Sequence, residues 1–466
     1  MRYIPYGAVG QVTGSRHLIE CGNSSILLDC GLFQGEHERG AKLNHALPFD
    51  ASKINAVMLS HGHIDHSGSL PTLVKSGFRG HIYATSATRD VTELMLYDTA
   101  KIQRQDIEYK KRHNIPLTPE TEPIYEDKDV ADTMERFVTL EYDQCLPIQS
   151  GVEGCFYNSG HILGSAAIHL ELTEKNQAVR LAYSGDLGKK IMPILRGPEI
   201  LPESDVLICE STYGDRQHED LVEAEGLLQQ IIKEVVAKKA KIFVPAFALG
   251  RMQTLIYALH RLFDQKKIPT IPIYIDSPLA VDLTAVFAKH PECFDEETRR
   301  DFLARHEQPF RFPTLRYISS AEESKALNHQ PGPMMILATS GMVEAGRILH
   351  HLQNGIADPN NVILLVGYMA RNTLGRAILE GAKSVRVFRS TLPVRAKVIK
   401  INAYSAHADR DELAEYIAAT PGLKELFLVH GDADTRQKFA QYLRAKSAVL
   451  KIRLPEYGEE FNLTSE

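Results

Sequence analysis

A short run of histidines and one aspartate is the densest group of metal-ligating side chains in the sequence. The run reads His61-Gly62-His63-Ile64-Asp65-His66, and it follows an apolar stretch that ends at Leu59. Imidazole and carboxylate groups are ligands that zinc, iron and manganese accept. Because these side chains stand on one turn, they can converge on a single point. The run therefore predicts a metal site, against the alternative of a dense surface loop of histidines.

Single residues with ligand chemistry follow other predicted strands. His161 lies in a glycine-flanked loop, while Asp186 and His430 each come directly after a strand-like stretch. Each alone has the ordinary alternative of a surface residue, but one loop cannot complete two tetrahedral sites without further ligands. A carboxylate at Asp186 can bridge two ions that hold a hydroxide between them. We therefore predict a hydrolase with two Zn²⁺ per chain and Mn²⁺ as an acceptable substitute.

The elements that must position these residues change character along the chain. Before residue 210 they are short strands separated by glycine-rich turns, namely 2–6, 17–19, 25–30, 56–59, 154–158, 166–172, 179–184 and 206–210. From about residue 221, helical patterns alternate with apolar strands at 241–245, 272–276, 333–338 and 361–366. This alternation predicts right-handed βαβ units and a parallel sheet. We expect an α/β unit at 211–393 inserted into a discontinuous host domain at 1–210 and 394–466.

Glu210 and His407 stand on either side of the predicted insertion. Glu210 ends the strand before it, and His407 follows its end in Ala403-Tyr404-Ser405-Ala406-His407. Both therefore lie where the insertion meets the host, which predicts that they are in contact. The contact has two interpretations, a catalytic pair or an ion pair that ties the insertion to the host.

Composition and charge narrow the class of protein. The chain has 466 residues, 44% hydrophobic and 24% charged, which fits two or three globular units of a soluble enzyme. No apolar run reaches the roughly 18–20 residues of a membrane span, and no cleavable signal begins the chain. Six cysteines without a CxxC pair predict reduced thiols and a cytoplasmic location. A net charge of −6 argues mildly against a nucleic-acid-coating protein, although bound zinc would offset it locally.

The His-x-His-x-Asp-His run, with Asp29 before it and further ligands after it, resembles the metallo-β-lactamase superfamily. The resemblance implies an αββα sandwich. It also implies that His61, His63 and His161 hold one zinc and that Asp65, His66 and His430 hold the other, with Asp186 shared. Asp29 would lie behind the ligands and orient them; its alternative is a turn-forming residue before Cys30.

The chain as a whole resembles the β-CASP nucleases, the group that contains ribonuclease J and the endonuclease subunit of the cleavage and polyadenylation specificity factor. The motifs that carry this likeness are Ser211-Thr212-Tyr213-Gly214, Asp276-Ser277-Pro278, Thr339-Ser340-Gly341-Met342 and Val429-His430-Gly431. The resemblance implies that the insertion is a β-CASP domain. In this family a histidine at position 430 goes with RNA substrates, whereas DNA-specific members carry valine there. RNA is therefore the expected partner.

The expected chemistry is hydrolysis of RNA phosphodiester bonds that leaves 5′-phosphate and 3′-hydroxyl ends. Asp65 would orient the proton of a metal-activated hydroxide, and the metals would offset charge on the phosphate oxygens. His407, kept protonated by Glu210, would donate to the phosphate or to the leaving 3′ oxygen.

A loop in the predicted insertion has the composition of a phosphate-binding turn. Ser340, Gly341 and Met342 separate an apolar strand from a helix, and Arg347 follows closely. Small residues before a helix leave backbone N–H groups to meet an anion. We expect these residues to contact RNA phosphates, with an ordinary turn between strand and helix as the alternative.

Rival functions share part of this pattern. A thioester hydrolase of the glyoxalase II type needs the metal ligands but neither the insertion nor Glu210 and His407. A DNA nuclease of the same family should lack His430, and a non-catalytic scaffold should have lost ligands. The cleavage mode (endonuclease or 5′→3′ exonuclease) and a homodimeric assembly stay open.

Overall fold

The computed structural model describes residues 1–466 except 35–36, 118–121, 301–308, 368, 370–371, 447–449 and 464–466. The chain forms two compact units. Unit 1 comprises residues 1–192, 196–217 and 407–466, and unit 2 comprises residues 193–195 and 218–406. The sequence analysis puts the boundaries of the insertion at 210/211 and 393/394. The compact units divide the chain at 217/218 and 406/407, so both boundaries lie later in the chain.

Unit 1 contains two seven-stranded sheets. The first has the order β22 (Phe461–Asn462), β1 (Arg2–Pro5), β2 (His17–Cys21), β3 (Ser24–Leu28), β4 (Ala56–Met58), β5 (His81–Ala84) and β6 (Phe137–Thr139). The second has the order β21 (Lys451–Arg453), β20 (Glu425–Leu428), β11 (Val206–Cys209), β10 (Gln177–Tyr183), β9 (Ala166–Glu174), β8 (Val152–Asn158) and β7 (Cys145–Gln149).

Helices cover the outer faces of these sheets. The helices of unit 1 are α1 (His37–His45), η1 (Ala51–Lys53), α2 (Ile64–Ser67), α3 (Leu70–Lys75), α4 (Ser86–Arg112), α5 (Asp127–Met134), α13 (Arg410–Ala419) and α14 (Ala433–Lys446). Leu70 and Leu73 of α3 pack on the first sheet, and Leu413 of α13 and Phe439 of α14 pack on the second. The layers are therefore helix, sheet, sheet and helix.

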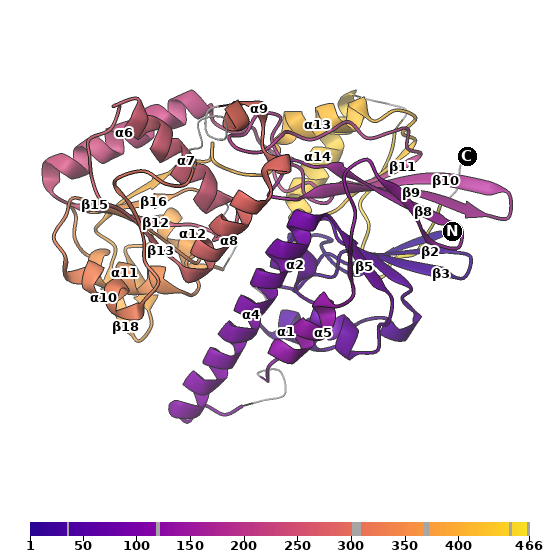
Figure 1. Ribbon diagram of the computed structural model, residues 1–466, viewed down its shortest axis with the longest axis horizontal. Helices are drawn as coiled ribbons and strands as arrows, with labels where there is room; N and C mark the ends of the chain where they lie inside the picture. The colour runs from indigo at the N-terminus through magenta and orange to yellow at the C-terminus, as the bar shows by residue number, and fades with distance from the viewer. Residues whose placement is uncertain are drawn as a thin grey trace. The chain divides into compact units, whose positions relative to one another are not determined.

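The main core of unit 1 lies between the two sheets. Ile26 and Met58 of the first sheet belong to the same buried cluster as Phe156 and Ile208 of the second. Each fully buried side chain of this size contributes roughly 1.5–3 kcal/mol. Sheets that pack face to face across such a core are a sandwich. The predicted fold class, an αββα sandwich with an inserted α/β domain, is confirmed (Figure 1).

Unit 2 is built on a six-stranded parallel sheet. Its order is β14 (Leu315–Tyr317), β13 (Ile273–Asp276), β15 (Met334–Ala338), β12 (Lys241–Pro245), β16 (Val362–Leu365) and β19 (Lys397–Lys400), and β17 (Ser384–Val387) and β18 (Ser390–Pro393) form a separate hairpin. Its helices are α6 (Leu221–Lys238), α7 (Arg251–Asp264), α8 (Pro278–Lys289), η3 (Pro291–Cys293), α9 (Glu296–Thr298), α10 (Ala321–His329), α11 (Arg347–Gly355) and α12 (Leu374–Leu379).

The sheet of unit 2 includes one strand that the sequence analysis assigns to the host. β19 pairs with β16, with Ile363 opposite Val398. Residues 397–400, which the sequence analysis places in the host at 394–466, therefore belong to the insertion's sheet. A short strand carries no local signal for the sheet that it joins, because strand pairing is decided by tertiary contacts.

One pair of cysteines differs from the expectation of reduced thiols. Cys145 on β7 faces Cys155 on β8, and the two form a disulfide. The spacing of ten residues gives no CxxC signal, and only the hairpin register brings the two sulfur atoms together. The other cysteines, Cys21, Cys30, Cys209 and Cys293, are buried and are not disulfide-bonded. Among the described helices, none has the length and apolarity needed to span a bilayer.

Candidate metal centre

The histidine run lies on the loop that follows β4 and on the short helix α2. His63 is the residue before α2, and Asp65 and His66 stand within that helix. The loop passes close to α4, because a Cβ atom on Gly62 would lie only 2.5 Å from Val91 Cγ1. A larger residue would collide with Val91, so glycine at position 62 allows the loop to pass this close to α4.

Parallel strands of the second sheet place the other ligands at one edge. β10, β11 and β20 are adjacent and parallel, with Tyr183 opposite Ile208 and Cys209 opposite Leu428. Carboxyl ends of parallel strands meet at a common edge, where ligands usually bind. Asp186, Glu210 and His430 follow these three strands in the sequence.

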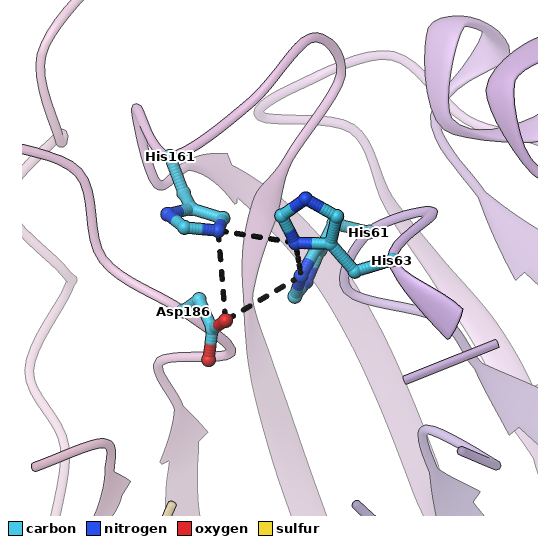
Figure 2. Close-up of side chains that lie close together, drawn as sticks. All are labelled: His61, His63, His161 and Asp186. Atoms are coloured by element: carbon cyan, nitrogen blue, oxygen red, sulfur yellow. Dashed lines mark hydrogen bonds and ion pairs between the residues drawn. The ribbon is translucent and has the colours of Figure 1, made fainter. Parts of the chain in front are cut away.

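A first group of four side chains converges on one point. His61, His63, His161 and Asp186 each offer a ligand atom, and these atoms all lie within 4.8 Å of one another. His63 Nδ1 is 3.1 Å from His61 Nε2 and 3.3 Å from His161 Nε2. Asp186 Oδ2 lies 3.6 Å from His61 Nε2 and 3.5 Å from His161 Nε2. Figure 2 shows the four side chains turned toward a common space.

A second group lies on the other side of Asp186. It consists of Asp65, His66 and His430. His430 Nε2 is 3.2 Å from His66 Nε2 and 3.5 Å from Asp65 Oδ2. Asp186 Oδ1 lies 3.4 Å from His66 Nε2, so the two oxygens of this carboxylate face different groups. We refer to the seven residues of both groups as the metal centre.

The metal centre fits metal ions better than it fits a hydrogen-bonded cluster. Asp186 Oδ1, which faces the second group, is buried and has no hydrogen-bond partner among the described residues. Buried polar atoms are almost always paired, because an unpaired one loses its hydration without compensation. A set of imidazole nitrogens and carboxylate oxygens facing a common space is the donor set that zinc prefers.

Burial sets the protonation of the ligands. It lowers the pKa of His63 to about 4 and holds the pKa values of His61 and His161 well below the usual range. Neutral imidazole is the form that binds a metal. Burial also opposes charge on His66, but Asp186 and Asp29 outweigh it and raise the pKa of that histidine. The opposing carboxylates therefore make His66 the most basic imidazole of these four.

Asp29 bonds to the loop and to one histidine of the metal centre. Its Oδ1 accepts a hydrogen bond from the Ser60 backbone N–H at 2.7 Å. Its Oδ2 lies 2.7 Å from His66 Nδ1 and from the hydroxyl of Tyr183. Asp29 is completely buried, with a φ of 60°. A carboxylate bonded to Nδ1 fixes the ring so that Nε2 faces the metal.

Glu210 and His407 are in contact at the rim of the metal centre. His407 Nδ1 lies 3.1 Å from Glu210 Oε1 and 3.2 Å from Oε2. Glu210 is fully buried, and it also accepts the backbone N–H of Leu187 at 2.7 Å. The ring of His407 is 4.4 Å from the ring of His161. Both residues belong to unit 1, although 197 positions separate them.

The predicted phosphate loop belongs to unit 2. The Ser340 N–H donates to the Ala345 carbonyl at 3.1 Å, and its hydroxyl accepts the Glu344 N–H at 3.0 Å. Arg347 Nη1 lies 2.5 Å from Asp276 Oδ1, and Nη2 donates to the Ser319 carbonyl at 2.7 Å. The guanidinium is therefore directed at an internal carboxylate and carbonyl groups.

Sequence reasoning missed several residues that support the ligands. Thr212 Oγ1 lies 3.0 Å from His430 Nδ1, and Ser60 Oγ lies 3.0 Å from His61 Nδ1. The hydroxyl of Tyr183 reaches Asp29 from β10. The available signals were the position of Ser60 directly before the histidine run and that of Thr212 within Ser211-Thr212-Tyr213-Gly214. Nothing local pointed to Tyr183.

Three protein-family comparisons cover most of the chain. Residues 18–187 match the metallo-beta-lactamase superfamily domain, and residues 252–378 match the Beta-Casp domain. Residues 391–455 match the Zn-dependent metallo-hydrolase RNA specificity domain.

Several relatives match the chain over almost its full length. Ribonuclease TTHA0252 of Thermus thermophilus is 35% identical, over 98% of this chain and 99% of its own. An RNase J-like protein of Methanocaldococcus jannaschii is 31% identical, over 93% of each chain. Endoribonuclease YSH1 of Kluyveromyces lactis is 28% identical, over 97% of this chain and 58% of its own.

A solved structure supports the fold alone. The crystal structure of a protein of unknown function from Enterococcus faecalis V583 covers 99% of both chains with a TM-score of 0.52 and 13% identity.

Proposed function

The chain belongs to the β-CASP family of metallo-β-lactamase-fold nucleases, and from that premise we propose that it is a two-zinc ribonuclease. The proposed products carry 5′-phosphate and 3′-hydroxyl ends. The observation that carries the proposal is the position of Asp186, whose two oxygens face two separate groups of ligands. One carboxylate shared in this way is the arrangement that holds two metal ions a few ångströms apart.

The proposed ligands follow from these contacts. His61, His63 and His161 would hold one zinc, and Asp65, His66 and His430 the other. Zinc bound there would lower the pKa of a coordinated water and offset charge on the phosphate oxygens. Asp29, Ser60 and Thr212 fix the ligand rings through bonds to Nδ1 atoms or to the loop that carries them.

Asp65 and His407 have the proposed roles closest to the reacting atoms. The carboxylate of Asp65 would orient the proton of the attacking water. His407 is bonded to Glu210 through Nδ1, so Nε2 would present its proton to the phosphate or to the leaving 3′ oxygen. The buried Glu210 carboxylate holds this orientation of the ring through its contacts with Nδ1.

RNA is the proposed substrate for two reasons. Residues 391–455 match a domain described by RNA specificity, and the aligned relatives bear the names ribonuclease and endoribonuclease. His430, one of the three residues of the second ligand group, lies within that domain. We also propose the cytoplasm as the compartment in which the protein acts.

The loop at Ser340, Gly341 and Met342 is proposed to contact RNA phosphates. The internal bonds of Ser340 hold the shape of the loop, and those of Arg347 hold the start of α11 to β13 through Asp276. In this proposal Arg347 contributes to RNA binding indirectly, because it holds in place the loop that contacts the phosphates. Its positive charge is balanced by the Asp276 carboxylate.

The test compares three substrates with zinc-loaded protein. End-labelled RNA, DNA of the same sequence and a glutathione thioester are incubated in parallel. We expect cleavage of RNA alone, with 5′-phosphate and 3′-hydroxyl ends identified by mass spectrometry. Cyclic 2′,3′-phosphate ends would refute a water nucleophile. Hydrolysis of the thioester without RNA cleavage would establish the glyoxalase II type of function in its place.

A further inference from the structure

The long helix α4 packs against unit 1 along only part of its length. Near its start, Val91 lies beside Gly62 of the metal-binding loop. Further on, Leu96 and Ala100 are buried in a cluster with Val130 of α5. Gln103 Oε1 then accepts the backbone N–H of Ile124 at 2.7 Å. The contacts that fix α4 in unit 1 therefore extend from the metal centre to about residue 104.

Beyond residue 104 the helix buries no side chain. Every residue from Gln105 to Leu117 is exposed, except for the half-buried Ile107 and Lys110. Figure 1 shows this part of α4 extending away from the rest of unit 1. Most helices in proteins are stabilised by packing an apolar face, and this segment does not use that source of stability.

The end of this segment combines positive charge with exposed rings. We call residues 109–117 the α4 tip. It carries Lys110, Lys111 and Arg112 and no acidic residue, in a chain with a net charge of −6. The rings of Tyr109 and His113 lie 4.1 Å apart with an interplanar angle of 32°, and Tyr109 is 46% exposed.

The helix dipole alone does not explain this composition. Cations in the last turn stabilise the carboxyl end of a helix, which accounts for the sign of the charges. It does not account for a paired tyrosine and histidine beside them, nor for the exposed Ile115 and Leu117. Cations that neutralise phosphates, together with rings on which bases stack, are the features of surfaces that bind single-stranded nucleic acid.

We propose that the α4 tip anchors single-stranded RNA at a distance from the metal centre. Lys110, Lys111 and Arg112 would pair with phosphates, and the Tyr109–His113 ring pair would stack on a base. This inference rests on the proposed ribonuclease function. Thr92, beside Gly62, and Tyr109 are 17 residues apart on one helix, a separation of about 26 Å at 1.5 Å per residue. A stacked strand covers that distance with roughly eight nucleotides.

The reach of α4 predicts that the effect depends on RNA length. We compare Lys110→Ala/Lys111→Ala/Arg112→Ala with a matched control, Lys53→Ala/Lys175→Ala/Lys451→Ala, which removes the same charge from exposed positions of unit 1. Alanine is the best helix former, so α4 should persist in the tip variant, as circular dichroism can verify. The substrates are a six-nucleotide and a thirty-nucleotide single-stranded RNA with zinc-loaded protein.

For the longer RNA, the tip variant should show a KM raised by on the order of tenfold with kcat unchanged. The slope of log affinity against log salt should become shallower by about 2, since each phosphate contact on a single strand contributes about 0.7. Tyr109→Ala should weaken binding of the longer RNA on the order of tenfold without changing that slope. Cleavage of the short RNA should be unaffected in both variants.

Three results would contradict the proposal that the α4 tip binds single-stranded RNA. The first is equal KM and equal salt slope in the tip variant and the control. The second is an equal effect on the short and the long RNA. The third is a parent that dimerises through the tip, seen as a dimer in sedimentation that the tip variant converts to monomer while RNA affinity stays the same. If the parent cleaves neither RNA, the proposed function fails, and fluorescence anisotropy of the uncleaved long RNA still decides whether the tip binds it.

Discussion

Among the described residues, two buried clusters each join histidine to an aspartate that lies at or just after the end of a strand. One is the metal centre of unit 1, built around Asp186. The other lies in unit 2, and we call it the Asp276 cluster; it consists of Asp276, Ser324, Asn328, Arg347 and His351. In both, a histidine nitrogen faces an aspartate that is almost completely buried.

The two clusters differ in how their polar atoms are paired. In the Asp276 cluster, Asp276 Oδ2 lies 2.7 Å from His351 Nε2, and His351 Nδ1 lies 2.7 Å from Asn328 Oδ1. The other oxygen of Asp276 is bonded to Arg347. In the metal centre, Asp186 Oδ1 lacks such a partner among the described residues. A buried cluster that satisfies itself stabilises a fold, whereas one with unpaired donor atoms is prepared for a ligand.

The largest expected effect tests the shared carboxylate. Asp186→Ala should lower the zinc content from two ions to fewer than one, because both groups of ligands lose the same residue. RNA cleavage should fall by at least about 10³-fold, since metal ions supply several kcal/mol of charge stabilisation. Zinc is measured by mass spectrometry on dialysed protein, and turnover on end-labelled RNA. A variant that keeps both ions would show that Asp186 is not shared.

His407 separates catalysis from metal binding. His407→Ala should retain both zinc ions while turnover falls by a factor on the order of 10²–10⁴, the usual effect of removing a positioned proton donor. Glu210→Gln should cause a smaller loss, because the ring stays in place. Loss of zinc from the His407→Ala variant would show that His407 is a metal ligand. Full activity with zinc bound would leave it as a structural partner of Glu210.

The Asp276 cluster should respond in the opposite way. Asp276→Asn removes the charge that balances Arg347 and the partner of His351, so unfolding in urea should require about 3 kcal/mol less free energy. The zinc content should stay at two ions per chain, and turnover per folded molecule should change little. The matched comparison is Asp186→Asn, which should lose zinc; because bound zinc itself stabilises the folded state, its unfolding free energy is compared with that of the parent after zinc has been removed from both, and there the change should be smaller. Loss of zinc from Asp276→Asn would contradict the distinction between the two clusters.

The smallest expected effect concerns the orientation of one ligand. Thr212→Val keeps the shape of the side chain but removes the hydroxyl that lies 3.0 Å from His430 Nδ1. The affinity for one of the two zinc ions should fall by about 10–100-fold, as for other residues that orient a ligand. Competition with a chromophoric chelator measures this affinity without reference to activity. Thr212→Ser should keep the parent affinity, and an equal loss in both variants would exclude the hydroxyl as the cause.

The sequence by itself determined the features that depend on residue type and on neighbouring positions. The histidine run at 61–66 predicted a metal site, because imidazoles and a carboxylate on one turn are metal ligands in any fold. The alternation of strands and helices predicted the parallel sheet of unit 2, and strands were expected at 241–245 and 361–366 where β12 and β16 are found. Both signals are local, so no knowledge of distant contacts was needed.

Tertiary structure alone decided which distant residues meet. Asp186 faces two groups of ligands because β10, β11 and β20 are parallel neighbours, a pairing that no local pattern encodes. A backbone bridge between Gly188 and His407 brings His407 to Glu210 across 197 positions, and a hairpin register brings Cys145 to Cys155. The direction of Arg347 toward Asp276 likewise depends on how α11 packs on β12 and β15. Strand order, register and packing are cooperative properties of the folded chain, because a side chain's partners come from segments far away in the sequence.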